Sequence, residues 1–339
     1  MLKIGVIGAG HLGKIHLKCL KQIPEIELVG FYDVNTETAK EISETYQTKA
    51  FPDEASLIAA SDAVDIVSPT TYHFTLAMDA MRQGKHVFIE KPITARLEDS
   101  QTIVEYSEQH HLKVQVGHVE RFNDAYLNAK HALGNPLFIE AHRLAEFNPR
   151  GTDVSVVLDL MIHDIDLVLS MIPHDLIQVS ASGVPIISNT PDVANARLTF
   201  ANGAVANLTS SRIALKHMRK MRLFQPNSYI SMDFFDKKVN IMQLRDYKPE
   251  DENDLLPLII DLGADKGKKR IFIESPHEIA VNAIQTELSL FAKSILNNLP
   301  CEVSARDGHN ALKVAYKIME CMDRQAQWVK KKCSQSVKL

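Results

Sequence analysis

Three side chains with proton-transfer chemistry lie close together in one apolar segment. Asp159 and His163 are four residues apart, and Asp166 follows three residues later. This spacing puts all three on one face of a helix expected over roughly 154–171. Polar groups on an otherwise buried helix are costly unless they are paired or line a cleft. An imidazole titrates near neutral pH, so His163 is suited to take a proton from a substrate hydroxyl.

Two other interpretations of this polar stripe stay open at the level of the residues. The helix could expose an ordinary solvated face or bury a histidine whose hydrogen bonds are satisfied. Asp159 and His163 could also bind zinc, but a catalytic zinc site needs three protein ligands and no further His or Cys cluster is evident. We therefore expect no metal.

A lysine that could face a substrate follows a predicted strand. The run Glu90-Lys91-Pro92 comes directly after the strand expected over 86–89, and ligands of open α/β sheets bind at the carboxyl ends of the strands. Lys91 could hydrogen-bond a substrate oxygen and stabilise negative charge that develops there. An exposed lysine at a strand end is also common.

A glycine-rich turn near the N-terminus predicts a dinucleotide site. Gly8, Gly10 and Gly13 form the pattern G-x-G-x-x-G between a predicted strand and a predicted helix. The first glycine permits a tight turn, the second lets the backbone approach a pyrophosphate, and the third allows the helix to pack closely on the strand. His11 and Leu12 then lie at the helix N-terminus, which favours phosphate charge.

Asp33 stands twenty positions after Gly13, at the end of the second predicted strand. A carboxylate there can accept hydrogen bonds from the adenosine ribose diol. It would repel the 2′-phosphate of NADP, and the following Val34 and Asn35 offer no cation. NAD is the expected cofactor and NADP is less favoured. The alternative is a glycine turn followed by a helix-capping aspartate.

The elements that must position these residues alternate in the first third of the chain. Strands are expected over 3–7, 27–32, 64–68, 86–89 and 113–116, with helices such as 15–22 and 75–83 between them. This alternation predicts an α/β Rossmann domain over 1–120, with a doubly wound parallel sheet.

Beyond residue 117 the pattern changes to consecutive β-rich runs. Strands are expected over 204–212, 219–224, 229–235 and 238–244, and helices follow at about 278–297 and 305–327. Short connections predict antiparallel pairing. The second domain, 121–339, is thus expected to be α+β with a large, mostly antiparallel open sheet. An acidic then basic stretch, 249–270, is expected to leave this sheet as an irregular excursion.

Composition limits the classes of function. At about 150 residues per domain, 339 residues predict two domains, and 38 Lys and Arg against 42 Asp and Glu give a net charge of −4. This balance offers no basic surface for nucleic acid. No run approaches the roughly 20 apolar residues of a membrane helix, and the first ten residues lack a signal-peptide pattern. A cytoplasmic protein is expected. Four widely spaced cysteines predict neither a zinc knuckle nor disulfides.

Four motifs in this order resemble the glucose-fructose oxidoreductase and inositol dehydrogenase (Gfo/Idh/MocA) family over essentially the full chain. They are the glycine turn at 8–13, DIVSPTTYH at 65–73, GKHVFIEKP at 84–92, and Asp159-x-x-x-His163-x-x-Asp166. The resemblance implies an NAD(P)-dependent dehydrogenase that transfers hydride from a sugar hydroxyl to the nicotinamide. It also implies a homodimer or homotetramer formed through the C-terminal sheet, whose apolar face would otherwise stay open.

The resemblance further implies roles for single residues. Those expected near the nicotinamide are Ser68, Thr70, His73, Glu90 and Lys91. Lys91, Asp159 and His163 would form the reacting group. His163 would take the hydroxyl proton, Lys91 would stabilise the alkoxide, and Asp159 would orient the substrate or His163. Which of Lys91 and His163 finally holds the proton varies within the family.

Two segments resemble the nucleotide-sugar branch of that family. They are GHVERFN at 117–123 and RGTD at 150–153, while a Gly-Gly pair that many relatives carry before the catalytic Asp is missing. The chain resembles UDP-N-acetylglucosamine 3-dehydrogenases, which make the 3-keto sugar that an aminotransferase converts for lipid A synthesis. Arg121 and Arg150, with Arg143 and the arginines of 212–222, would grip the diphosphate.

Two alternatives to a nucleotide-sugar dehydrogenase remain. A dehydrogenase of a free sugar or an inositol-type polyol would use the same Lys91, Asp159 and His163 without a phosphate grip. An NAD-binding regulatory protein would keep the dinucleotide fold and have lost turnover, because a fold alone never proves activity.

Overall fold

The computed structural model describes residues 1–148, 154–248, 258–263, 267–276 and 282–336. The chain divides into two compact units, 1–122 with 281–314, and 123–280 with 315–339. The boundary near residue 122 lies close to the one expected at 120. The sequence predicts a second domain over 121–339, which would include residues 281–314. In the structure these residues belong to the first unit.

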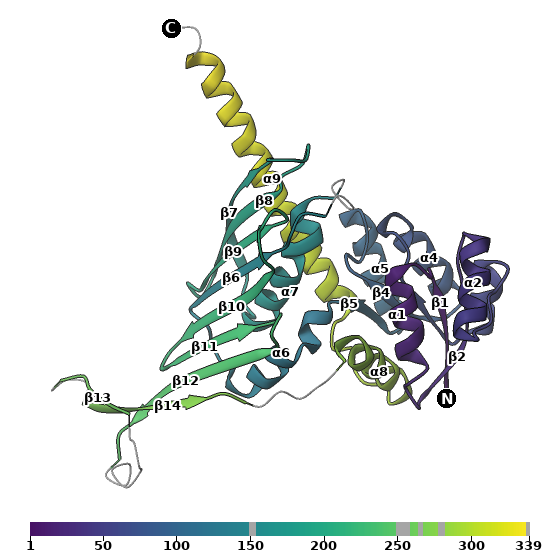
Figure 1. Ribbon diagram of the computed structural model, residues 1–339, viewed down its shortest axis with the longest axis horizontal. Coiled ribbons are helices and arrows are strands. Elements are labelled where there is room, and N and C mark those ends of the chain that lie inside the picture. Colours follow the sequence, from purple (N-terminus) through teal and green to yellow (C-terminus); the bar gives the residue numbers. More distant parts are fainter. Residues whose placement is uncertain (149–153, 249–257, 264–266, 277–281, 337–339) are drawn as a thin grey trace. The chain divides into compact units, whose positions relative to one another are not determined.

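The first unit is built on a parallel sheet. Its described strands are β1 (Leu2–Ile7), β2 (Ile26–Tyr32), β3 (Ala63–Ile66), β4 (His86–Glu90) and β5 (Val114–Gly117), in the order β2-β1-β3-β4-β5 (Figure 1). All neighbouring pairs are parallel, which confirms the expected doubly wound sheet. The strand order reverses at β1, between β2 and β3, and ligands of such sheets bind at this switch point.

Helices cover this sheet and come from both ends of the chain. They are α1 (His11–Leu20), α2 (Thr36–Tyr46), α3 (Glu54–Ala60), α4 (Thr70–Arg82), α5 (Leu97–Gln109), the 3₁₀ turn η1 (Val119–Phe122) and α8 (Ala283–Leu296). Leu17 and Leu20 of α1 share one buried cluster with Phe88 of β4 and with Leu288 and Phe291 of α8. This apolar contact explains why α8 belongs to the first unit.

Two helix ends differ from the expected ranges near the C-terminus. The α8 helix begins at Ala283, where the Asn282 side chain accepts a hydrogen bond from the Gln285 N–H. Residues 278–281 of the expected helix lie outside the described residues. The last helix, α9 (Ala305–Ser336), runs nine residues past the expected end at 327. No helix in the described residues is long and apolar enough to cross a membrane.

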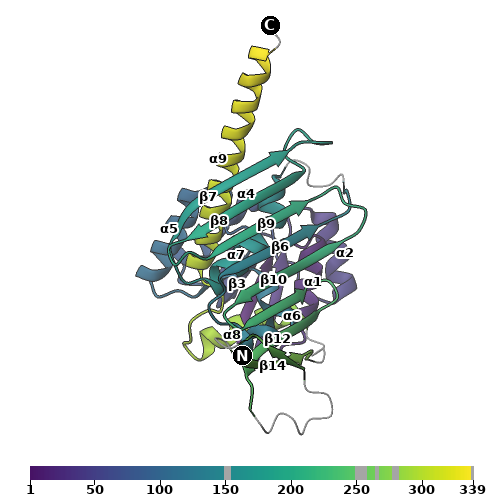
Figure 2. The same ribbon diagram turned by 90° about the vertical axis from the view of Figure 1, so that its left-hand side faces the viewer.

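The second unit contains one large sheet, seen face-on in Figure 2. Its described strands are β6 (Phe138–Leu144), β7 (Leu176–Val184), β8 (Val193–Phe200), β9 (Val205–Ser211), β10 (Met218–Gln225), β11 (Ser228–Asp233), β12 (Lys238–Asp246), β13 (Ile259–Asp261) and β14 (Lys268–Glu274). Their order is β13-β14-β12-β11-β10-β6-β9-β8-β7. Only the β6–β9 pair among these neighbours is parallel, so the mostly antiparallel sheet is confirmed.

Two expectations for this sheet are wrong in detail. The expected run of adjacent strands is broken because β6 lies between β9 and β10. The stretch 249–270, expected to leave the sheet, contributes β13 and the start of β14 in its described parts. Strand β14 pairs with β12. The guanidinium groups of Arg245 on β12 and Arg270 on β14 both lie over the ring of Phe272 on β14. Basic residues are common on such outlying strands.

The two faces of the large sheet differ in polarity. Inner-face residues such as Ala141, Leu208 and Leu223 are fully buried. The inner face packs against α6 (Asp124–Ala129), the π-helical turn η3 (Val157–Met161) and α7 (Ile162–Met171). Arg143 is also on this buried side, and its guanidinium donates to both carboxylate oxygens of Asp164, at 2.8 and 3.1 Å.

Arg143→Met leaves the buried Asp164 carboxylate without this partner, and we expect the free energy of unfolding to fall by about 3–5 kcal/mol. Arg222→Met is the control, because it breaks the exposed pair with Glu140, which contributes about 0–1 kcal/mol. Urea denaturation measures both. Equal losses in the two variants would contradict this account of the buried pair.

Candidate active site

The glycine turn after β1 has the geometry of a dinucleotide cradle. Gly8 has a φ of +98°, and a Cβ added there would lie 2.7 Å from the Val67 carbonyl oxygen. A Cβ on Gly13 would lie 2.1 Å from the Gly8 carbonyl oxygen, whereas one on Gly10 would meet no atom within 4 Å. The chain's own backbone thus requires Gly8 and Gly13. Gly10 instead leaves open space, as a pyrophosphate would need.

The helix that follows this turn leaves its N-terminus open to an anion. Helix α1 begins at His11, its N-cap is Gly10 without a side-chain hydrogen bond, and its first turn carries no acidic residue. The N–H groups of a first helical turn have no partner within the helix and attract negative charge. The residues present therefore fit the phosphates of a dinucleotide.

Asp33 joins the end of β2 to the glycine turn. Its Oδ2 accepts a hydrogen bond from the Ala9 N–H at 2.8 Å, and its Oδ1 accepts one from the Asn35 N–H at 2.9 Å. A pocket of about 420 Å³ lies beside it, lined in part by Lys40 of α2. The sequence interpretation missed this cation because it considered only the two residues that directly follow Asp33.

The loops after β3 and β4 are tied together by a histidine. The ring nitrogens of His73 lie 2.9 Å from the carbonyl oxygens of Pro92 and Ser68. Burial lowers the pKa of His73, against the effect of these two carbonyls, and a neutral ring donates to only one of them. His73 therefore lies between the two loops and donates a hydrogen bond to one of them. The Ser68 hydroxyl is buried without a hydrogen-bond partner among the described residues, so it could bind an added group, and Thr70 begins α4 beside it.

Glu90 and Lys91 lie at the carboxyl end of β4. The Lys91 N–H donates to Glu90 Oε2 at 3.1 Å, and the Lys91–Pro92 peptide is cis. Glu90 is buried and Lys91 is half-buried. The structure thus brings the glycine turn, Asp33, Ser68, Glu90 and Lys91 to one edge of the parallel sheet, as the sequence predicts for strand ends.

The polar stripe expected on one helix is divided by a π-helical turn. Asp159 lies within η3 and His163 in the first turn of α7, and both are half-buried. Asp166 is only 1% exposed. The extra residue of a π turn changes the register, and such turns are frequent at functional sites. Residue spacing alone does not reveal this insertion.

The arginines expected to hold a diphosphate have partners within the protein. The pairs are Arg121 with Asp307 at 3.7 Å, Arg143 with Asp164, Arg212 with the Val154 carbonyl and Asp192, and Arg222 with Glu140. Arg143 and Arg212 are nearly fully buried and so are part of the core, which corrects their expected role. Arg121 is also mostly covered, and Arg150 lies outside the described residues.

The residues expected to react are divided between the two units. Lys91 belongs to the first unit, and Asp159 and His163 belong to the second. Each group is half-buried at the surface of its own unit.

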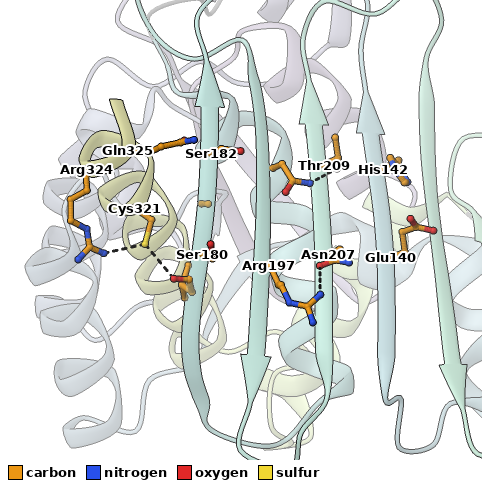
Figure 3. A pocket seen from close by; sticks show the side chains of 13 residues that line it. Glu140, His142, Ser180, Ser182, Arg197, Asn207, Thr209, Cys321, Arg324 and Gln325 are labelled. Carbon is orange, nitrogen blue, oxygen red and sulfur yellow. Dashed lines mark hydrogen bonds between the residues drawn. The ribbon is translucent and has the colours of Figure 1, made fainter. Parts of the chain in front are cut away.

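A separate polar pocket of about 740 Å³ lies on the outer face of the large sheet (Figure 3). Its polar lining includes Glu140, His142, Ser180, Ser182, Asn195, Arg197, Asn207, Thr209, Arg324 and Gln325. Several of these pair with one another, as in Arg197 with Asn207. The helix that carries His163 packs on the opposite face of the sheet. This pocket is therefore distinct from the expected catalytic residues.

The parallel sheet, the glycine turn and the acidic end of β2 together define a dinucleotide-binding oxidoreductase domain. Residues 2–118 match the family model for the oxidoreductase family with an NAD-binding Rossmann fold. Residues 127–226 match the model for the GFO/IDH/MocA C-terminal domain. The chain belongs to the GFO/IDH/MocA oxidoreductase family, as its motifs indicate.

Characterised relatives define the kind of reaction. The chain is 39% identical over 241 residues to UDP-N-acetylglucosamine 3-dehydrogenase of Acidithiobacillus ferrooxidans, covering 71% of this chain and 76% of that one. A solved structure of that enzyme matches with a TM-score of 0.84 at 32% identity, over 95% of this chain and 98% of that chain. An inositol 2-dehydrogenase/D-chiro-inositol 3-dehydrogenase of Halalkalibacterium halodurans is 34% identical over 195 residues, 53% of this chain and 56% of that one. The protein is an oxidoreductase that acts on CH–OH groups.

Gly10→Ala and Gly13→Ala separate the binding role from the packing role within the turn. We expect Gly10→Ala to keep its free energy of unfolding within about 1 kcal/mol but to weaken NADH binding at least tenfold, since its methyl group enters the open space. Gly13→Ala should lower the thermal midpoint, because its methyl group meets the Gly8 carbonyl. Nucleotide fluorescence and thermal unfolding measure these effects. Normal NADH affinity in Gly10→Ala would contradict the cradle.

Proposed function

We propose that the protein oxidises a hydroxyl group of a nucleotide sugar, with UDP-N-acetylglucosamine as substrate, a 3-keto sugar as product and NAD as hydride acceptor. The observation that carries this proposal is the similarity to UDP-N-acetylglucosamine 3-dehydrogenase, which extends over 95% of the chain in structure. In sequence the chain is 39% identical to that enzyme over 71% of its length, against 34% over 53% and 26% over 93% for two inositol dehydrogenases.

The catalytic chemistry in this proposal is a proton transfer coupled to loss of hydride from one carbon. A bound nicotinamide supplies the hydride acceptor. His163 takes the proton of the sugar hydroxyl, because an imidazole has a pKa suited to a general base near neutral pH. Lys91 hydrogen-bonds the same oxygen and stabilises the negative charge that develops on it. Asp159, one helical turn before His163, orients the substrate or the imidazole.

The half-buried placement of these side chains supports the assignment. Asp164 and Asp166 lie on the same helix and are nearly fully buried, whereas Asp159 and His163 are half-buried. Lys91 follows the carboxyl end of β4, and Glu90 binds its backbone N–H. This hydrogen bond anchors the main chain at Lys91.

NAD is the proposed cofactor in preference to NADP. The Asp33 carboxylate can accept hydrogen bonds from a ribose diol and would repel a 2′-phosphate. Lys40 lines the pocket beside Asp33, and its positive charge would instead attract a 2′-phosphate. We give Asp33 the larger weight because it stands at the strand end, whereas the Lys40 side chain is exposed on α2.

Arg121 and Arg150 are proposed to contact the diphosphate of the substrate. The Arg121 guanidinium lies 3.7 Å from Asp307, and an arginine fork matches the geometry of a phosphate in bidentate contacts. A free sugar or inositol would not need these contacts. That polyol alternative is favoured by the inositol dehydrogenase relative. An NAD-binding regulatory protein remains the alternative of another class.

Lys91→Ala and His163→Ala should each lower kcat by about 10²–10⁴-fold, while NADH binding stays within threefold of wild type. Lys293→Ala and His174→Ala, which change exposed side chains, are the matched controls and should keep normal turnover. NADH absorbance is followed with NAD or NADP and with UDP-N-acetylglucosamine, inositols or glucose.

Near-normal kcat in either active-site variant would contradict the catalytic assignment. Turnover with inositol or glucose but not with the UDP-sugar would favour the polyol alternative. NADH binding without turnover on any member of the panel would favour the regulatory alternative. Faster turnover with NADP than with NAD would show that Lys40 outweighs Asp33.

We also propose that a second copy of the chain covers the outer face of the large sheet. A row of apolar side chains crosses five adjacent strands there, formed by Phe138, Phe224, Tyr229, Met242 and Ile273. Phe224 is 41% exposed and Ile273 is 63% exposed. Exposed apolar rows of this kind are typical of association surfaces.

Phe224→Glu should therefore reduce the mass of the particle that light scattering measures to that of a single chain, because it places a charge inside the row. Lys293→Glu, on an exposed position of α8 in the first unit, is the control for the added charge. A wild-type protein that is already monomeric would contradict this proposal.

A further inference from the structure

Four ionisable side chains meet inside the first unit, and one of them is Glu90, the residue before Lys91. They are His16 of α1, Asp65 of β3, Glu90 of β4 and Glu287 of α8. His16 Nδ1 lies 2.9 Å from Asp65 Oδ2, and His16 Nε2 lies 3.2 Å from Glu90 Oε1. His16, Asp65 and Glu287 are fully buried, and Glu90 is 8% exposed. The catalytic scheme above uses none of His16, Asp65 and Glu287.

The geometry favours a charged imidazole in this cluster. Both ring nitrogens of His16 face carboxylate oxygens, and a neutral ring carries a proton on only one nitrogen. A neutral His16 would turn a lone pair toward one of two buried carboxylates, which is repulsive. An imidazolium instead hydrogen-bonds to Asp65 through Nδ1 and attracts the Glu90 carboxylate, whose Oε1 lies 3.2 Å from Nε2 outside hydrogen-bond geometry.

The pKa directions agree with this distribution of charge. Burial opposes the charged form of His16, but Asp65 and Glu90 raise the pKa of the imidazole well above 6.5. Burial raises the pKa of Glu287 well above its usual value, and the charge of Glu90 adds to this effect. Burial also raises the pKa of Asp65, against the effect of His16. Glu287 is therefore the neutral member of the cluster.

The Glu90 carboxylate is confined on three sides. His16 contacts Oε1, and the Lys91 N–H donates to Oε2 at 3.1 Å. On the third side lies Gly117 of β5, where an added Cβ would come within 2.8 Å of Oε1 and 2.9 Å of Oε2. A glycine is thus needed at 117 to make room for this carboxylate. The sequence interpretation used Gly117 only as part of a family segment.

We infer that His16, anchored by Asp65, is a positioning residue that fixes the Glu90 carboxylate and, through the Lys91 N–H, the backbone at the start of the Lys91 loop. The inference rests on the proposed function in one respect, namely that Lys91 contacts the substrate. His16 acts from inside the unit and touches neither substrate nor cofactor. Loss of its proton removes the attraction to Glu90, so Lys91 is held less firmly.

The surroundings of His16 set the direction of the pH effect. The titratable groups that face it are Asp65, Glu90, Glu287 and the Cys19 thiol, and the Phe88 ring packs edge-on at 5.8 Å. Since the pKa of His16 is raised on folding, the stabilising contact is present at low and neutral pH. It is lost as the pH rises through the folded-state pKa. Activity should therefore fall on the alkaline side.

The test compares His16→Gln, Gly117→Ala and Glu287→Gln in the full-length protein with NAD and UDP-N-acetylglucosamine. We expect His16→Gln and Gly117→Ala to lower kcat by about 10–10²-fold, because a small misplacement of a reacting group has effects of this size. Glu287→Gln should stay within threefold of wild type, since an amide replaces a neutral acid. The alkaline decline that depends on His16 should be absent from the pH profile of His16→Gln. Gly117→Ala keeps the inference testable if His16→Gln fails to fold.

An unchanged kcat and pH profile in His16→Gln would overturn the inference, as would equal losses in Glu287→Gln and His16→Gln. The competing account is a metal ion among His16, Glu90 and Glu287, whose donor atoms lie within 4.8 Å of one another. One equivalent of a divalent metal in the purified protein would also overturn the inference.

A measurement without substrate separates this inference from the proposed function. Histidine ring NMR of the free protein, with the His16 signal assigned from His16→Gln, should show a doubly protonated ring persisting above pH 6.5. A neutral His16 ring at pH 7 would overturn the inference even if the enzyme turns over. A doubly protonated ring in a protein that oxidises no sugar would support the charge cluster and contradict only the proposed function.

Discussion

The close approach of backbone segments at the carboxyl edge of the parallel sheet is the constraint on which the rest of the structure depends. Gly8 passes against Val67, Gly13 packs on Gly8, and Gly117 leaves room for the Glu90 carboxylate. Side chains at these points would force β1, β3, β4 and β5 apart. With glycine there, the strand ends converge, and Asp33, Ser68 and Lys91 reach one edge of the sheet. The cofactor site follows from this packing more than from any single ligand-binding residue.

Polarity is distributed in opposite ways in the two units. The first unit buries a compact charge cluster, His16 with Asp65, Glu90 and Glu287, directly behind its strand ends. The second unit buries the Arg143–Asp164 pair and leaves Asp159 and His163 half-exposed. Buried ion pairs add little stability compared with apolar residues, but they fix orientation when every partner is present. Both clusters therefore contribute mainly by orienting the elements that carry the reacting groups.

The sequence predicts the first unit well and the second less completely, for physical reasons. Buried parallel strands are continuous apolar runs, so β1 to β5 lie within two residues of their expected bounds. The insertion of β6 between β9 and β10, and the packing of α8 on α1, depend on contacts between residues far apart in the chain. An apolar helix face such as that of Leu288 and Phe291 does not specify its partner. The π turn that holds Asp159 and precedes His163 has no spacing signature, and the partners of Arg143 and Arg212 become visible only in the fold.

The central claim is that hydride leaves one carbon of a UDP-sugar for a nicotinamide cofactor beside Lys91. The most direct measurement uses UDP-N-acetylglucosamine deuterated at C3 of the sugar, with mass spectrometry of the reduced cofactor. Our account predicts that the wild-type protein forms reduced cofactor with one deuterium per molecule. It predicts that Lys91→Ala forms almost no reduced cofactor. Reduced cofactor without deuterium would contradict oxidation at C3, and no reduced cofactor from the wild-type protein would contradict the nucleotide-sugar substrate.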